Sequence, residues 1–255
     1  DTFALDTGTL NSWRLDLRMG TIQTHDAKYV SQTVPEVMVQ STSNPVSVTF
    51  QNTGWVNWTS AANIRLGSEN PSDSNVFGWT RQSLGGAENI LRGQNKVWNF
   101  NVTAPATKGL YNFRTRMLRE GAFRFGEYSP NVPVRVVQTG NDAEFVSQSV
   151  PLQMKKSSTQ FISITMRNTG STTWNAGNDV YRLGSQAPTD TQRWGFRRLF
   201  APPNANIAPG QTYTWNYSIS TPPNPGFYTF QWRMVQEGVQ FFGEQTPALN
   251  IEIIN

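Results

Sequence analysis

The stretch GLYNFRTRMLREGAFRFGE, which runs from Gly109 to Glu127, decides the fold because the chain repeats it. The second version, GFYTFQWRMVQEGVQFFGE, runs from Gly226 to Glu244. The two versions share glycine, tyrosine, phenylalanine, Arg-Met, Glu-Gly and Phe-Gly-Glu at the same positions, so that Gly226 follows Gly109 by 117 residues. We therefore interpret the stretch as a hairpin that was duplicated and then changed at some positions.

The duplication extends over most of the chain. DAKYVSQTVP (Asp26–Pro35) returns as DAEFVSQSVP (Asp142–Pro151), NTGWVNW (Asn52–Trp58) returns as NTGSTTW (Asn168–Trp174), and RLGS recurs as well. A repeat of this length is far longer than the unit of a solenoid or a propeller. The sequence therefore predicts two tandem domains, over residues 26–138 and 139–255, behind an N-terminal segment of residues 1–25.

Each copy shows the alternation that is typical of half-buried strands. Val46, Val48 and Phe50 alternate with polar residues, and their counterparts Ile162, Ile164 and Met166 do the same. Turns rich in proline and glycine interrupt the chain at short intervals, and no amphipathic helical pattern is present. Short strands with such turns are typical of an antiparallel β-sandwich. We predict an all-β fold of two tandem immunoglobulin-like antiparallel β-sandwiches.

Two tyrosines support the immunoglobulin-like assignment. Tyr111 and Tyr228 each follow a turn of proline and glycine at the start of a late strand. This placement resembles the tyrosine corner of immunoglobulin-like sandwiches, in which the phenol bonds back to the preceding turn. Both copies should therefore contain such a corner.

The tryptophans of the second copy point to a family. Trp174, Trp194, Trp215 and Trp232, together with NTG, RLGS and WRMVQEG, resemble the four-tryptophan (FW) immunoglobulin-like domain. That domain is known from the central region of a selective-autophagy receptor and from bacterial secreted proteins, so the resemblance implies a secreted or cell-surface bacterial protein. The first copy has diverged, because it has FGW where the second has WGF, and Thr115 where the second has Trp232.

The N-terminal segment leaves two interpretations open. DTGTLNSWRLDL (Asp6–Leu17) resembles the closing strand of the P domain, a β-sandwich that follows the catalytic domain in proprotein convertases and bacterial subtilisin-like proteases. This resemblance implies that the chain is the C-terminal part of a longer exported hydrolase. The alternative is an ordinary edge strand of the first sandwich.

The residue types argue against catalysis by this chain. The chain has no cysteine and one histidine, His25, so a thiol nucleophile and a zinc site built from cysteine and histidine are excluded. Glu120 and Glu237 occupy equivalent positions in separate copies, too far apart for glycosidase carboxylates. Each follows an arginine by four residues, Arg116 or Arg233, and this spacing predicts an ion pair between the two. We expect no enzyme activity, no cofactor and no metal.

Two surfaces are candidates for binding. The first copy is the more basic, with eleven Lys or Arg against seven Asp or Glu over residues 26–138, whereas the whole chain has a net charge of +4. Its hairpin carries arginines where the second copy has glutamines or phenylalanine, and this hairpin is the first candidate surface. The second candidate surface surrounds RWGFRRLF (Arg193–Phe200) and its counterpart FGWTRQSL in the first copy. The predicted ligand-binding residues are Arg114, Arg116, Arg119, Arg124, Trp79, Arg81, Arg197 and Arg198.

Two functions remain open at this point. One is a non-catalytic binding or targeting module that attaches an exported hydrolase to a protein or polysaccharide surface, including an anionic one. We expect no nucleic acid partner. The other is a structural spacer or assembly module without a ligand of its own. No stretch reaches the ~20 apolar residues of a membrane-spanning helix, and the oligomeric state cannot be derived from the sequence.

Overall fold

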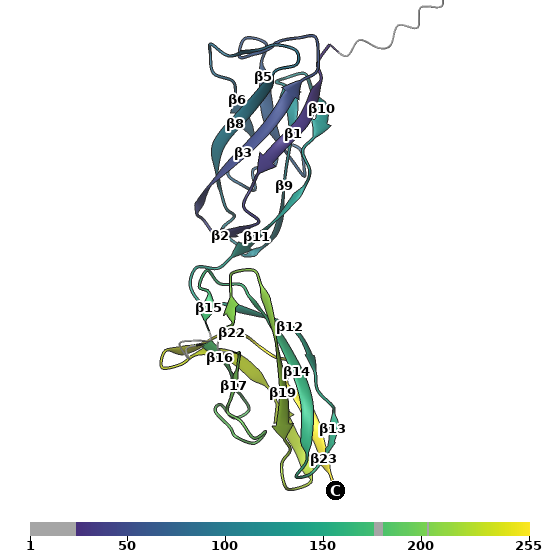
Figure 1. Ribbon diagram of the computed structural model, residues 1–255, viewed down its shortest axis with the longest axis vertical. Helices are drawn as coiled ribbons and strands as arrows, with labels where there is room; N and C mark the ends of the chain where they lie inside the picture. The colour runs from purple at the N-terminus through teal and green to yellow at the C-terminus, as the bar shows by residue number, and fades with distance from the viewer. Residues whose placement is uncertain (1–23, 176–180, 203) are drawn as a thin grey trace, which may run out of the picture.

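The computed structural model describes residues 24–175, 181–202 and 204–255. All regular elements in these ranges are β-strands, and they form two sandwiches that are stacked end to end along the long axis (Figure 1). The all-β prediction of two tandem immunoglobulin-like sandwiches is therefore confirmed. The proposed P-domain pattern at Asp6–Leu17 lies outside the described residues.

The first sandwich consists of two main sheets. One sheet has the strand order β1-β3-β8, and the other has the order β2-β11-β9-β5-β6, with β10 also paired to β9. All pairs are antiparallel except that of β2 with β11. The strands are β1 (Ala27–Thr33), β2 (Val37–Val39), β3 (Ser43–Asn52), β4 (Trp58–Thr59), β5 (Ile64–Glu69), β6 (Arg81–Ser83), β7 (Asn89–Ile90), β8 (Asn95–Thr103), β9 (Gly109–Arg119), β10 (Phe123–Tyr128) and β11 (Val132–Val137).

The second sandwich repeats this order. Its sheets read β12-β14-β19, β13-β23-β20 and β17-β16-β21-β22, and β20 and β21 are the two halves of the copy of β9. The strands are β12 (Ala143–Ser149), β13 (Gln153–Lys155), β14 (Thr159–Asn168), β15 (Trp174–Asn175), β16 (Tyr181–Ser185), β17 (Arg198–Phe200), β18 (Asn206–Ile207), β19 (Thr212–Ser220), β20 (Gly226–Phe230), β21 (Trp232–Gln236), β22 (Gln240–Gln245) and β23 (Leu249–Ile254).

The cores follow the predicted alternation. Val46, Val48 and Phe50 are buried in the first core, and their counterparts Ile162, Ile164 and Met166 are fully buried in the second. Successive side chains of a strand point to opposite faces of its sheet, so every second residue reaches the space between the sheets. The four tryptophans of the second copy are all buried, at 1% exposure or less.

Both predicted tyrosine corners are present. The Tyr111 hydroxyl donates to the carbonyl oxygen of Thr107 at 2.9 Å, and the Tyr228 hydroxyl donates to that of Asn224 at 3.0 Å. Each bond ties the start of a long strand to the turn before it, as in other immunoglobulin-like sandwiches.

The repeated NTG stretch has a structural cause. The side-chain amide of Asn52 donates to the carbonyls of Val56 and Ile90, and its Oδ1 accepts from the N–H of Gly54. Asn168 makes the equivalent three bonds in the second sandwich. Both side chains are fully buried, so they satisfy backbone groups that would otherwise be buried without a partner.

The two sandwiches meet at a short junction. The backbone N–H of Gln138 donates to the carbonyl of Thr169 at 2.7 Å. Lys108 of the first sandwich forms a 2.6 Å ion pair with Asp142, whose Oδ2 also accepts from the Thr169 hydroxyl. The loop at Gly210 lies directly under the first sandwich, because a Cβ on this residue would lie 3.2 Å from Val37 Cγ2.

Candidate functional site

The candidate site lies on strands β9 and β10 of the first sandwich. Arg114 and Arg116 are two residues apart on β9, so their side chains leave the same face of the sheet. Tyr128 at the end of β10 is the strand partner of Arg116. The two arginines and this tyrosine are therefore neighbours on one surface.

Both guanidinium groups lie over the Tyr128 ring. The Cζ atoms of Arg114 and Arg116 are 4.0 and 4.3 Å from the centroid of the tyrosine ring. At this distance the cations are attracted by the negative face of the ring. We call Arg114, Tyr128 and Arg116 the arginine–tyrosine stack.

Backbone carbonyls hold the inner edge of each guanidinium. Nε of Arg114 donates to the carbonyl of Ser129 at 3.2 Å, and Nε of Arg116 donates to that of Gly126 at 3.1 Å. Nη1 of Arg116 also donates to the Tyr128 hydroxyl at 3.0 Å. Within the part of the chain that the structure describes, neither arginine has a carboxylate partner, so both positive charges remain available.

A bulge in β10 positions the tyrosine. The register of the β9–β10 pair shifts between Phe125 and Tyr128. Gly126 adopts a φ of +71° there, and a Cβ at this residue would lie 2.5 Å from atoms of Ala27. Only glycine combines this backbone conformation with such close packing. The shift brings Tyr128 opposite Arg116.

Three asparagines continue the same surface. Asn112 lies on the arginine face of β9, two residues before Arg114. Its Oδ1 accepts from the Asn131 side chain at 2.8 Å, and Asn131 in turn accepts from Asn70 at 2.8 Å. This row of amides extends the polar surface beside the stack.

Arg124 and Arg81 have a different environment from the stack. Arg124 forms ion pairs with Glu69 at 2.6 Å and with Asp73 at 2.5 Å. Arg81 pairs with the same Asp73 and with Glu120. Both side chains are about one-fifth exposed. Their charges are therefore neutralised within the first sandwich, although a role in binding remains a prediction.

The expected ion pairs of Arg116 with Glu120 and of Arg233 with Glu237 are wrong. Glu120 pairs with Arg65 and Arg81 instead, and the second copy pairs Glu237 with Arg182 and Arg198. Residues four apart on one strand are separated by roughly 13 Å, since a strand rises about 3.3 Å per residue. The carboxylates therefore reach arginines on neighbouring strands.

Arg119 is exposed at the end of β9, away from the stack. It lies near His25, whose ring packs edge-on against Phe123 with 5.1 Å between ring centroids. Burial, and in second place the positive charge of Arg119, lower the pKa of His25 below its ordinary value of 6.5. The structure thus places Arg119 at the end of the sandwich.

Most side chains of the second predicted surface are buried or held in ion pairs. Trp194 is 1% exposed, and Trp79 is 8% exposed and packs on Phe100 with 4.7 Å between ring centroids. Arg198 pairs with Asp190 and Glu237, with its side chain 13% exposed. Arg197 is exposed. The structure does not bring these residues together with the stack, and their part in binding stays a prediction.

Tyr128 was not among the predicted site residues. The signal was present in the repeat, because Tyr128 corresponds to Gln245 just as Arg114 corresponds to Gln231. Two neighbouring positions therefore changed together between otherwise copied hairpins. Their proximity depends on the bulge, which the sequence pattern does not reveal.

No group of three or more metal-ligating side chains occurs within residues 24–175, 181–202 and 204–255. The same ranges contain no helix long and apolar enough to cross a membrane. A groove beside Arg116 is lined by polar groups that include Asp26, Lys28 and Glu127.

The second sandwich matches the model of a known family. Residues 150–252 match the family model described as "Ig-like domain from next to BRCA1 gene". This range contains all four of the tryptophans on which the sequence resemblance rests. The second sandwich is thus similar to the four-tryptophan immunoglobulin-like domains. A comparison with curated proteins found none that matches the chain.

Solved structures resemble the chain only in fold. The D1–D4 ectodomain fragment of ICAM-5 is 14% identical, with a TM-score of 0.32, over 89% of this chain and 53% of that one. The adhesin InvE of Yersinia pseudotuberculosis is 12% identical, with a TM-score of 0.31, over 93% of this chain and 62% of that one. The chain thus spans about half to three-fifths of these two proteins. It is a tandem pair of immunoglobulin-like β-sandwiches.

Proposed function

We propose that this chain is a non-catalytic binding module whose first sandwich attaches to an acidic polymer or acidic protein surface through the arginine–tyrosine stack. The observation that carries the proposal is the pair of guanidinium groups on Tyr128, neither of which has a carboxylate partner among the residues that the structure describes. Of the six other arginines of the same sandwich, Arg65, Arg81 and Arg124 are in ion pairs.

The geometry suits planar anions. Each guanidinium uses its Nε for a backbone carbonyl. Among the described residues, the outer N–H groups of Arg114 and the second Nη of Arg116 have no acceptor. Arginine binds planar carboxylate groups through such outer pairs of donors. Because Tyr128 and the backbone already hold both side chains, little conformational entropy is lost on binding.

A structural spacer is the second candidate. The junction supports it, since the Lys108–Asp142 pair, the Gln138–Thr169 hydrogen bond and the Gly210 contact all hold one sandwich on the other. A spacer needs this rigid connection but no available cations. The two candidates therefore differ in what they require of Arg114 and Arg116.

We also propose where this chain lies in a longer protein. The resemblance of Asp6–Leu17 to a closing P-domain strand supports a place behind the catalytic domain of a secreted hydrolase, such as a subtilisin-like protease. In that setting the sandwiches act outside the cell, on a protein or polysaccharide surface. The arginine–tyrosine stack would then bring the hydrolase to anionic material.

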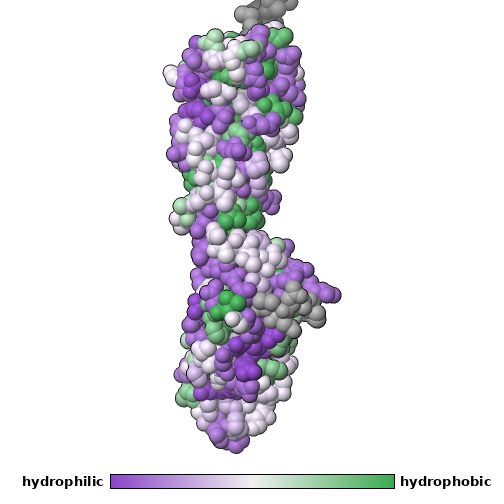
Figure 2. Space-filling view, turned by 90° about the vertical axis from the view of Figure 1, so that its left-hand side faces the viewer, coloured by the Kyte–Doolittle hydropathy of each residue, from purple (hydrophilic) through white to green (hydrophobic). Residues whose placement is uncertain are grey.

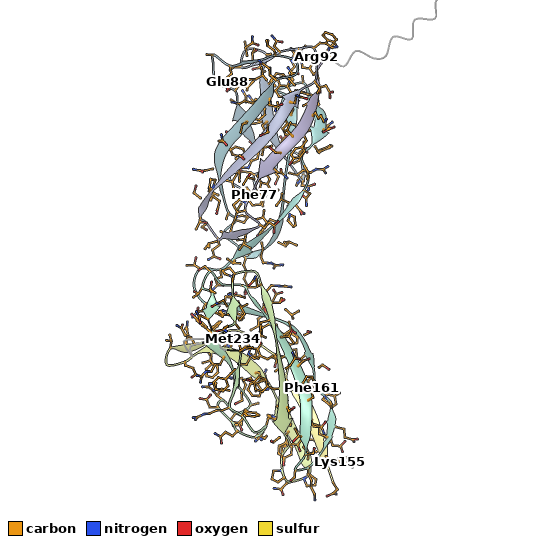
Figure 3. The ribbon with its side chains drawn as sticks, viewed as in Figure 1. Phe77, Glu88, Arg92, Lys155, Phe161 and Met234 are labelled. Atoms are coloured by element: carbon orange, nitrogen blue, oxygen red, sulfur yellow. The ribbon has the colours of Figure 1, made fainter. Side chains whose placement is uncertain are left out.

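The test uses immobilised poly-L-glutamate and a matched pair of double variants. One variant carries Arg114→Gln and Arg116→Gln. The control carries Lys155→Gln and Lys156→Gln at the far end of the second sandwich, where Figure 3 labels Lys155. Both variants lose two positive charges, so a general effect of net charge is the same in each.

We expect the parent and the lysine control to be retained at low salt and released as salt screens the charges, with a Debye length of ~10 Å at 0.1 M. The Arg114/Arg116 variant should elute near the void volume. Equal retention of both variants would show that the stack is a solvated surface, and would favour the spacer. The melting temperatures should stay close to that of the parent, because surface substitutions change stability by about 0.5 kcal/mol or less.

A further inference from the structure

The three-stranded sheet of each sandwich has an outer face that is uncharged at its centre. On both faces, one row across the strands consists of two hydroxyl side chains and one amide. The rows are Thr33–Ser47–Asn99 on β1, β3 and β8, and Ser149–Ser163–Asn216 on β12, β14 and β19. Neighbouring strands lie about 4.8 Å apart, so each row spans roughly 10 Å. We call the two outer faces that carry these rows the polar faces.

A groove crosses the row of the first polar face. It has a volume of about 480 Å³ and is lined mainly by Thr33, Pro45, Ser47, Asn99, Phe100 and Asn101. This volume lies within the range of about 300–1,000 Å³ that is usual for small-molecule sites. No charged side chain is among the residues that line the groove. Its lining therefore suits a ligand without charge.

The polar groups of both rows are free to bind a ligand. Among the described residues, none of these hydroxyl and amide side chains makes a hydrogen bond to another protein group. Amides elsewhere on the same sheets do, since Gln32 donates to the carbonyl of Pro130 at 2.8 Å and Gln148 donates to that of Pro247 at 3.0 Å. A free asparagine amide offers two donors and one acceptor, which match the hydroxyl groups of a ligand.

An apolar ring lies beside each row. Pro45 and Phe161 occupy equivalent positions, two residues before the central serine of the row and therefore on the same face. Phe161, labelled in Figure 3, is 65% exposed, although Ile162 and Ile164 on the same strand are fully buried. A sugar presents one apolar surface of C–H groups and a rim of hydroxyls. Each polar face thus has a partner for both parts of a sugar ring.

A second copy of this chain does not suit the polar faces. Protein interfaces have a core that is enriched in aromatic and other apolar side chains. The exposed large apolar residues are only Val30 and Val97 on the first three-stranded sheet, and Val146 and Phe161 on the second. Figure 2 likewise shows scattered hydrophobic patches on the side of the molecule that it presents. These faces therefore lack the continuous apolar surface that stable pairing of two sheets requires.

We infer that the two polar faces bind an uncharged polysaccharide. The asparagine and the two hydroxyls of each row bond to sugar hydroxyls, and Pro45 or Phe161 packs on the C–H surface of a sugar ring. The two sheets lie one above the other along the long axis (Figure 1), so a polymer of repeating units can engage both and gain avidity. This site is independent of the arginine–tyrosine stack, which lies on the other sheet of the first sandwich and takes anionic groups.

Isothermal titration calorimetry tests this site on the full chain. The probes are soluble uncharged polysaccharides: hydroxyethyl cellulose, arabinoxylan, galactomannan and laminarin. The test variant carries Asn99→Ala and Asn216→Ala. The control carries Asn89→Ala and Asn250→Ala, two exposed asparagines outside the three-stranded sheets, one in each sandwich. All four side chains are exposed and uncharged, so both variants should fold as the parent does and keep its net charge.

We expect at least one of these polysaccharides to bind the parent and the control, and to bind the test variant about tenfold more weakly, because hydrogen bonds to the amides are lost. Binding should persist at about 1 M salt, where the Debye length is about 3 Å. It should also persist in the Arg114→Gln and Arg116→Gln variant, so this result is separate from the test with poly-L-glutamate. Absence of binding to all of the probes, or equal affinities of the test variant and the control, would overturn the inference. Dimers in sedimentation that only the test variant loses would also overturn it, since a second copy would then be the occupant.

Discussion

Arg124 on β10 places its Nη1 atom 2.6 Å from Oε1 of Glu69 on β5, and the Glu69 side chain is only 5% exposed. The second sandwich has Phe241 and Gln186 at these two positions. Gln186 is also buried, and the Phe241 ring lies over Gly184. One scaffold therefore uses a largely buried ion pair in the first copy and an uncharged pair in the second.

This difference leads to a double-mutant prediction. Arg124→Phe alone should lower the free energy of unfolding by about 3 kcal/mol, because it leaves the buried Glu69 carboxylate without its closest cation. Arg124→Phe with Glu69→Gln should recover most of that loss, since the pair then matches the second sandwich. Urea unfolding of both variants measures the effect. If the double variant were as unstable as the single one, the charge of Glu69 would not be the cause.

A second prediction concerns the second core. Trp215 lies in the middle of β19, is 1% exposed and packs against Tyr213 with 4.8 Å between ring centroids. Trp215→Ala should cost about 3–5 kcal/mol, as the loss of large aromatic side chains from cores does. Denaturant unfolding measures it, with Phe161→Ala as the exposed control. A cost below about 1 kcal/mol would contradict the observed packing.

The third prediction concerns His25. It is the single histidine of the chain, so its proton NMR signals cannot be confused with those of another histidine. The pKa of His25 should lie below the ordinary value of about 6.5. Since the folded chain then binds this proton less readily than the unfolded chain, His25 contributes stability above about pH 6.5 that is lost as the pH falls through its lower folded pKa. Arg119→Gln should raise this pKa only in part, because burial is the larger cause. An unshifted pKa would contradict the packing of the ring on Phe123.

Comparison of the two copies predicted the fold well. The buried positions around Val48 and Ile164 and both tyrosine corners could be predicted, because each depends on local alternation or on a turn next to it. The match of residues 150–252 to a family model agrees with the resemblance read from the tryptophans.

The candidate site could be predicted only in part. Arg114 was recognised from its contrast with Gln231 in the second copy, and Arg116 as part of the same basic hairpin, but the sequence could not show that Arg124 is paired with Glu69, which is 55 residues away. Tyr128 was missed for a similar reason, since the bulge at Gly126 determines which residue faces Arg116. Such pairings depend on register between strands, and register is set by the whole sheet.

The most direct test of the binding proposal moves the stack to the other sandwich. Arg233 already bonds to the Gly243 carbonyl at 2.9 Å, as Arg116 does to Gly126, and Gln245 is the strand partner of Arg233. Gln231→Arg with Gln245→Tyr should therefore rebuild the stack on the second sandwich.

The measurement is the affinity for poly-L-glutamate at low salt, in a chain whose own stack is removed by Arg114→Gln and Arg116→Gln. Gln231→Arg with Gln245→Tyr should restore binding close to that of the parent, whereas Gln231→Arg with Gln245→Leu, which adds the charge without the aromatic ring, should restore much less. Failure of the Arg–Tyr variant to bind better than the Arg–Leu variant would contradict the claim that the arginine–tyrosine stack is the binding element.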